Sequence, residues 1–175
     1  MIDASDPRHP VVTANLTDSP AALVPHETVH TNGHILVAGQ ADGENFAVYD
    51  ISDCRHPVLK SSIELPGSSG HMGDLAPDGR TYYLSQNPCC SGIGGPLYIV
   101  DLTDPFNAKQ LPTWNYVGEG TPHSLNLNPQ DFLPGVAEGT LMFVGQGRSF
   151  PFTDGQDGLV IEDVRDYQQS RQSAT

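Results

Sequence analysis

The stretch Leu97-Tyr98-Ile99-Val100-Asp101-Leu102-Thr103-Asp104-Pro105 recurs in near-copies along the chain. The second copy is Phe46-Ala47-Val48-Tyr49-Asp50-Ile51-Ser52-Asp53, and the third is Leu159-Val160-Ile161-Glu162-Asp163-Val164-Arg165-Asp166. A truncated first copy opens the sequence as Met1-Ile2-Asp3-Ala4-Ser5-Asp6-Pro7. We therefore interpret the sequence as a series of repeats.

The spacing of the copies indicates the class of repeat. Each apolar run closes with an aspartate, and these aspartates are Asp3, Asp50, Asp101 and Asp163. Successive spacings are 47, 51 and 62 residues, a period typical of β-propeller blades or comparable β-solenoid units. The aspartates themselves are expected to accept hydrogen bonds from nearby backbone N–H groups where a strand turns.

A tight-turn dipeptide precedes each full copy. The dipeptides are Asn32-Gly33, Asp78-Gly79 and Glu138-Gly139, and an apolar run follows each of them. Such glycines are typical of hairpin turns. Each repeat therefore predicts short strands: residues 26–31, 34–40, 46–50 and 58–65 in the first, 71–75, 81–86, 97–101 and 110–117 in the second, and 123–127, 141–145 and 159–163 in the third.

The strand at residues 97–101 is almost entirely apolar instead of alternating between apolar and polar residues. This pattern is typical of a strand whose two faces are both covered. Four-stranded sheets stacked on one another would cover it in this way. The sequence therefore predicts an all-β fold, and a β-propeller is the arrangement that also protects the sheet edges.

The repeated motif resembles that of the LVIVD-repeat β-propeller proteins: an apolar pair, Asp, a small or aliphatic residue, Ser or Thr, and Asp-Pro, as in residues 97–105. Residues 159–163 differ from the family strand at Glu162. The resemblance covers residues 1 to about 167 and implies a propeller of four-stranded antiparallel blades. Members of the family are mostly uncharacterised, and many look like exported or cell-surface proteins, so the resemblance slightly favours a periplasmic or extracellular location.

The repeats divide the chain into expected units. Residues 1–20 would end a preceding blade, residues 21–67 and 68–118 would form two blades, residues 119–167 would form a blade without its last strand, and residues 168–175 would form a polar tail. Propellers usually have about four to eight blades. We therefore expect an incomplete ring of about three blades, with missing blades of the same propeller as partners.

Charge and hydropathy exclude some partners. Eight Lys and Arg against 21 Asp and Glu give a net charge of −13, and this charge would repel the phosphate backbone of a nucleic acid. The sequence contains no apolar run of about 18 residues, so no membrane span is expected in this chain. A protein or a small molecule is the expected partner.

Three histidines open the first expected strands of the repeats: His26, His71 and His123. In a propeller the first strands line the central channel, so these imidazoles could converge and hold a divalent transition metal such as Zn, Cu or Fe. Glu27 and Asp74 would then be further ligands or partners of the ligands. The alternative is structural, with each histidine capping its own strand or bonding to neighbouring backbone.

The connections between second and third strands lengthen along the chain. From the Gln that ends the second strand to the Asp that closes the third, the distances are 10, 15 and 17 residues. These connections should gather at the histidine rim, and loops on a rigid scaffold are frequent binding sites. The candidate ligand-binding residues are Gln40, Gln86, Asn87, Cys89, Cys90, Gln146, Arg148, Ser149, Asp154 and Asp157.

Two functions remain open at this point. The first is a non-catalytic binding or scaffold protein that binds a protein or small ligand on the face with the histidines and long loops. The second is a metal-dependent enzyme with histidines at the channel mouth, similar in architecture alone to selenium-binding, methanethiol-oxidising propellers. A fold this general does not imply a function, so the sequence leaves open whether the protein is an enzyme.

Overall fold

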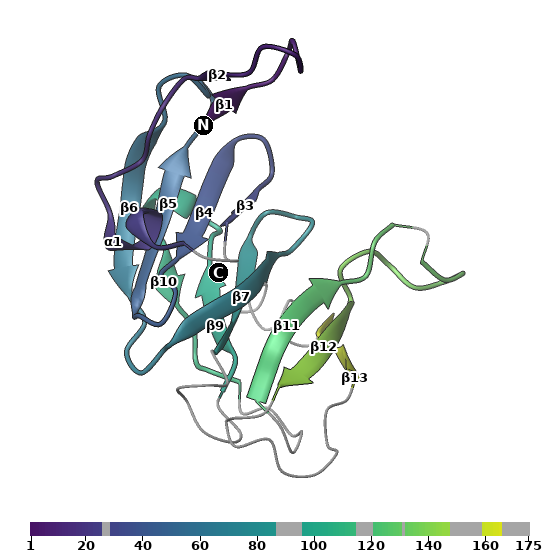
Figure 1. The fold of residues 1–175 in the computed structure, drawn as a ribbon. Helices are drawn as coiled ribbons and strands as arrows, with labels where there is room; N and C mark the ends of the chain where they lie inside the picture. Colours follow the sequence, from purple (N-terminus) through teal and green to yellow (C-terminus); the bar gives the residue numbers. More distant parts are fainter. Residues whose placement is uncertain (26–28, 87–95, 115–120, 131, 148–158, 166–175) are drawn as a thin grey trace.

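The computed structural model describes residues 1–25, 29–86, 96–114, 121–130, 132–147 and 159–165. These residues form four antiparallel sheets of two to four strands, which confirms the predicted all-β class (Figure 1). The described sheets do not close into a ring. The propeller arrangement therefore stays a prediction.

Each sheet is formed by one continuous segment of the chain. The N-terminal hairpin consists of β1 (Ile2–Asp3) and β2 (Val11–Val12), and the helical turn α1 (Pro20–Leu23) follows it. The first sheet, in the order β3-β4-β5-β6, contains β3 (Val29–Thr31), β4 (Ile35–Gly39), β5 (Asn45–Asp50) and β6 (Val58–Glu64).

The next two sheets have the same up-and-down strand order. The middle sheet contains β7 (Gly70–Leu75), β8 (Thr81–Gln86), β9 (Tyr98–Asp101) and β10 (Lys109–Gln110), with the 3-10 helix η1 (Pro105–Asn107) before β10. The third sheet contains β11 (Thr121–Leu127), β12 (Leu141–Gly147) and β13 (Leu159–Asp163). Among the helices that the structure describes, none is long and apolar enough to cross a membrane.

Where the structure describes them, the predicted strands are confirmed to within a few residues, except the strand expected at residues 110–117; residues 26–28 and 115–117 of the expected strands lie outside the described residues. There β10 is shorter and begins earlier, at Lys109, and its two residues pair with Val100 and Asp101. Pro112 follows, and it has no backbone N–H to donate to a ladder. Beyond Pro112, Trp114 is the described residue that pairs with the sheet again, opposite Leu97.

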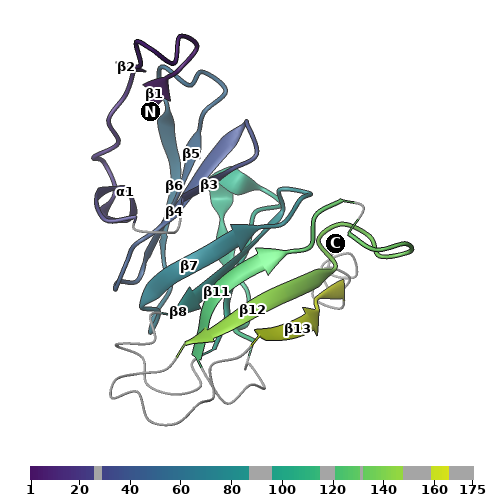
Figure 2. The ribbon, with the colours of Figure 1, turned by 45° about the vertical axis from the view of Figure 1, so that its right-hand side comes forward.

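The three larger sheets stack face to face. One buried cluster joins the first sheet to the middle sheet, and it includes Val37 and Val48 from the first, and Tyr82 and Val100 from the middle. A second cluster joins the middle sheet to the third through residues such as Tyr83, Ile99 and Val144. The inner strands β7 and β11 lie side by side (Figures 1 and 2).

The middle sheet is consequently covered on both faces. In β8, Tyr82 belongs to the cluster on one face, and Tyr83 belongs to the cluster on the other. In β9, Val100 and Ile99 are divided in the same way. Since successive side chains of a strand point to opposite faces, a strand between two neighbouring sheets buries both sets of side chains, as predicted for residues 97–101.

The outer face of the first sheet packs against the N-terminal segment. Ala21 of α1 is fully buried there with Leu36 and Tyr49. The Tyr49 hydroxyl donates a hydrogen bond of 2.7 Å to Asp18 Oδ1. Burial, together with this carboxylate, raises the pKa of Tyr49 well above its ordinary value. The N-terminal segment therefore packs on the outer face of the first sheet.

The aspartates that end the third strands cap turns, as predicted. Asp50 Oδ1 accepts a hydrogen bond of 3.0 Å from the N–H of Ser52, and Asp101 Oδ1 accepts one of 2.9 Å from Thr103. Asp3 and Asp163 do the same with the second residue after each of them. Just beyond the strand end, each carboxylate accepts a hydrogen bond from a backbone N–H that has no partner strand to bond to. These aspartates are therefore structural.

Candidate functional site

The strand order brings three connections to one edge of the stack. We call the edge at which β4, β8 and β12 end the loop-bearing edge (Figure 1). In an antiparallel sheet the start of the first strand lies beside the end of the second, so Gly70 pairs with Gln86, and Pro122 pairs with Gln146. His71 and His123, which follow Gly70 and Pro122, therefore belong by register to the same edge as Gln86 and Gln146.

Gln40 closes the turn between β4 and β5. Its Oε1 accepts a hydrogen bond of 2.5 Å from Asn45 Nδ2, and its backbone N–H donates to the Asn45 carbonyl at 2.7 Å. Gly43 lies against the Gln40 side chain, where an added Cβ would come within 2.4 Å of the amide carbon. Gln40 is thus partly buried and held in place by its own turn.

The same turn is bonded to the segment that leads into the middle sheet. The N–H of Asp42 donates to the Gly70 carbonyl at 3.0 Å, and the N–H of Gly70 donates to the Gly43 carbonyl at 3.2 Å. Glu44 Oε1 accepts a hydrogen bond of 2.7 Å from the N–H of Gly67. We call residues 40–45 and 65–70 the corner; these bonds fix the first sheet to the middle sheet at the loop-bearing edge.

Gln86 reaches the corner from the opposite side. Its side chain is buried, and Nε2 donates a hydrogen bond of 3.2 Å to the Gly67 carbonyl. Beside it, the Tyr98 hydroxyl donates to the Pro66 carbonyl at 3.1 Å, and burial raises the pKa of this hydroxyl. The structure therefore brings Gln40 and Gln86 to one corner, where Gln86 supports the edge from within.

The histidines of the second and third repeats occupy equivalent backbone positions. His71 follows Gly70 in β7, and His123 follows Pro122 in β11; in both strands the pairing register shifts at this point. The His71 side chain is only 9% exposed. At the register shift in β7, the Ser85 hydroxyl accepts a hydrogen bond from the N–H of Met72 and donates one to the Met72 carbonyl.

Asp74 joins the inner strands of all three larger sheets. Its Oδ1 accepts a hydrogen bond of 2.9 Å from the N–H of Leu75 and lies 3.6 Å from His30 Nδ1 in β3. Its Oδ2 accepts a hydrogen bond of 2.7 Å from the N–H of Leu127 in β11. A partly buried carboxylate with these partners ties three successive inner strands together.

His30 was not among the candidate residues, although it is the histidine that meets Asp74. His30, Asp74 and Asn126 are equivalent by register, since they pair with Val37, Tyr83 and Phe143 in the second strands. The turns between first and second strands differ in length, covering residues 32–34, 76–80 and 128–140. Spacing measured from the turn glycines therefore could not reveal the equivalence.

The pairing of His30 with Asp74 predicts a pH dependence of stability. Burial lowers the pKa of His30 below its ordinary value, and the Asp74 carboxylate and a hydrogen bond to Gly73 offset part of this effect. Between the folded and unfolded pKa values the unfolded chain binds more protons. The free energy of unfolding should therefore decrease as pH falls below about 6.5.

Denaturation of the wild type and of His30→Gln, at pH values about one unit above and one unit below 6.5, checks this expectation. The wild type should lose more stability than His30→Gln on acidification. His56→Gln is the matched control, because His56 is exposed and bonds only locally to Asp53. Equal losses in the wild type and His30→Gln would contradict the assignment to His30.

Several candidate residues lie outside the described residues. These are His26, Glu27, Asn87, Cys89, Cys90, Arg148, Ser149, Asp154 and Asp157. For His123 and Gln146 the structure describes the backbone but not the side chain. Within the described part of the chain, no group of three His, Cys, Asp or Glu side chains is close enough together to hold a metal ion.

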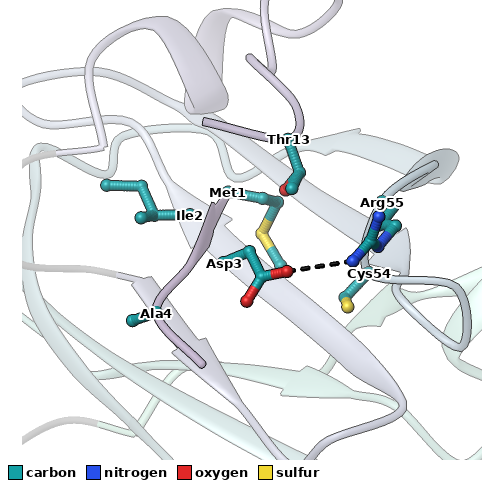
Figure 3. A pocket seen from close by; sticks show the side chains of 7 residues that line it. All are labelled: Met1, Ile2, Asp3, Ala4, Thr13, Cys54 and Arg55. Carbon is teal, nitrogen blue, oxygen red and sulfur yellow. Dashed lines mark hydrogen bonds and ion pairs between the residues drawn. The ribbon is translucent and has the colours of Figure 1, made fainter. Parts of the chain in front are cut away.

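A hollow of about 250 Å³ lies at the other end of the strands, between the N-terminal hairpin and the turn after β5. It is lined by Met1, Ile2, Asp3, Ala4, Thr13, Cys54 and Arg55. Asp3 Oδ2 and Arg55 Nη2 form an ion pair of 3.0 Å across it, as Figure 3 shows. The hollow thus marks the junction of the hairpin and the first sheet, away from the loop-bearing edge.

No protein-family model matches the chain, and no curated protein matches it. The functional interpretation therefore depends on the chemistry and position of the residues at the loop-bearing edge.

Proposed function

We propose that this protein is a binding or scaffold protein of the β-propeller type, which binds a protein or small-molecule partner at its loop-bearing edge. The observation that supports this most strongly is the corner. Backbone hydrogen bonds between Asp42, Gly43 and Gly70 fix two sheets to each other at the edge from which the connections extend. Loops on such a rigid base are where proteins commonly carry binding residues.

The described polar residues favour binding over catalysis. Gln86 and Asp74 are engaged with backbone groups, and the strand-end aspartates cap turns. These side chains stabilise the sheets that carry the loops. The partner would then bind to the connections that follow Gln86 and Gln146, which are longer in sequence than the connection after Gln40.

The charge of the chain narrows the class of partner. With a net charge of −13, the protein favours a partner that is basic or neutral and disfavours nucleic acid. An exported or cell-surface location belongs to the same proposal, and its support is the resemblance of residues 97–105 to the LVIVD repeat.

Site-specific photo-crosslinking in the cells that naturally produce the protein tests the proposal. A photoreactive amino acid is placed at Asn87, beyond the end of β8, and in a matched variant at Ser52, an exposed turn residue at the opposite edge. Mass spectrometry then identifies what is attached. We expect one recurrent protein or small molecule at position 87 and not at position 52. The same products at both positions, or none at position 87, would overturn the proposal.

A further inference from the structure

In each interface between the larger sheets, equivalent residues of the earlier sheet face the sheet that follows it along the chain. In the first sheet Val37 pairs with Val48, and both side chains face the middle sheet. In the middle sheet the equivalent pair, Tyr83 and Ile99, faces the third sheet. We call such side chains forward-facing and those of the opposite face backward-facing. Each interface between the larger sheets joins a forward face to a backward face.

The third sheet carries a forward face that no described sheet covers. Phe143 pairs with Ile161, so these two residues are equivalent to Val37 and Val48. Ile161 is 56% exposed, and Phe132, in the connection that leads to β12, is 41% exposed. The Phe132 ring contacts the Phe143 ring edge-on, with centroids 5.2 Å apart. We call Phe132, Phe143 and Ile161 the C-terminal face.

A backward face is exposed at the opposite end of the stack. Ile2 precedes Asp3 as Tyr49 precedes Asp50, and Tyr49 is backward-facing in the first sheet. Ile2 pairs with Val12, and these side chains are 66% and 71% exposed. Figure 3 shows Asp3 pointing toward Arg55 and Ile2 pointing to the other side. Ile2 and Val12 form the N-terminal face.

We propose that the C-terminal face of one copy of this chain binds the N-terminal face of a second copy. This contact continues the stack, because it repeats the direction of both internal sheet interfaces. Contact between two C-terminal faces would join two forward faces, which neither internal interface does. A head-to-tail contact uses two different surfaces of each copy, so it builds rings or open chains of copies.

The apolar chemistry of the two faces predicts how the association responds to salt. Each copy carries a net charge of −13, so the copies repel one another at low ionic strength. Salt screens this repulsion and does not weaken apolar contacts. Association should therefore become stronger as the salt concentration rises.

Sedimentation velocity over a wide concentration range tests the proposal on the full chain. The variants are Ile161→Asp in the C-terminal face, Val12→Asp in the N-terminal face, and Val58→Asp as control. Val58 is 49% exposed at the start of β6 and belongs to neither face. Thermal unfolding of each variant ensures that only folded protein is compared.

Wild type and Val58→Asp are expected to associate, and each face variant should weaken self-association by about tenfold or more. An equimolar mixture of Ile161→Asp and Val12→Asp should form dimers, because each variant retains the face that the other lacks. A monomeric wild type would overturn the proposal. Undiminished association of Val12→Asp alone would also overturn it, since that result requires a contact that does not use the N-terminal face.

Discussion

Replacement of Phe46 by alanine is expected to lower the free energy of unfolding by about 3 to 5 kcal/mol. Phe46 lies in β5, is fully buried between the first and middle sheets, and packs against Tyr82 with ring centroids 5.2 Å apart. Truncation would leave a cavity at the interface that holds the two sheets together. Chemical denaturation with linear extrapolation measures the loss.

Phe106→Ala is the matched control for this variant. Phe106 is 45% exposed and lies under the Lys60 ammonium, 5.3 Å from the ring centroid. The loss of an exposed cation–π contact is expected to cost about 0.5 to 1 kcal/mol. Equal losses in the two variants would show that Phe46 is not at a buried interface between sheets.

Replacement of Gly70 by alanine is expected to cost about 3 kcal/mol, at the upper end of the usual range for overpacking. An added Cβ would lie 2.5 Å from the backbone carbonyl oxygen of Gln40. A backbone atom in a hydrogen-bonded turn cannot move aside as the end of a flexible side chain can. The first and middle sheets must therefore separate at the corner, which denaturation and the amide signals of residues 40–45 would report.

Gly33→Ala provides the comparison for Gly70→Ala. Gly33 has a φ of +89°, but an added Cβ would meet nothing within 4 Å. Its replacement should cost only the strain of a left-handed residue, about 1 kcal/mol. A smaller loss for Gly70→Ala than for Gly33→Ala would mean that the two sheets are not held closely at the corner.

The elements that were predicted correctly are those with local causes. The run at residues 97–101 predicts a strand buried on both faces from its own composition. The glycines at 33, 79 and 139 predict turns from their residue type, and each of them has a positive φ in the structure. The strand-end aspartates bond to the second residue after them, so a short stretch of sequence contains the whole interaction.

The features that escaped prediction depend on contacts between distant residues. His30 meets Asp74 only because two sheets stack, and turns of different length hide their equivalence in the sequence. Gln86 was predicted from its spacing after Gly79, and spacing does not reveal that its amide is buried at the corner. The early end of β10 depends on Pro112, which no repeat pattern contains.

The stacked arrangement requires that the middle sheet be covered on both faces by its neighbours. Native-state hydrogen exchange tests it most directly, because amides in the most covered elements exchange only through global unfolding. We expect the amides of Tyr82, Tyr83 and Leu84 in β8 to exchange most slowly, and those of Val11 and Val12 in the N-terminal hairpin to exchange much faster. Exchange in β8 as fast as in the N-terminal hairpin would contradict the stacked arrangement.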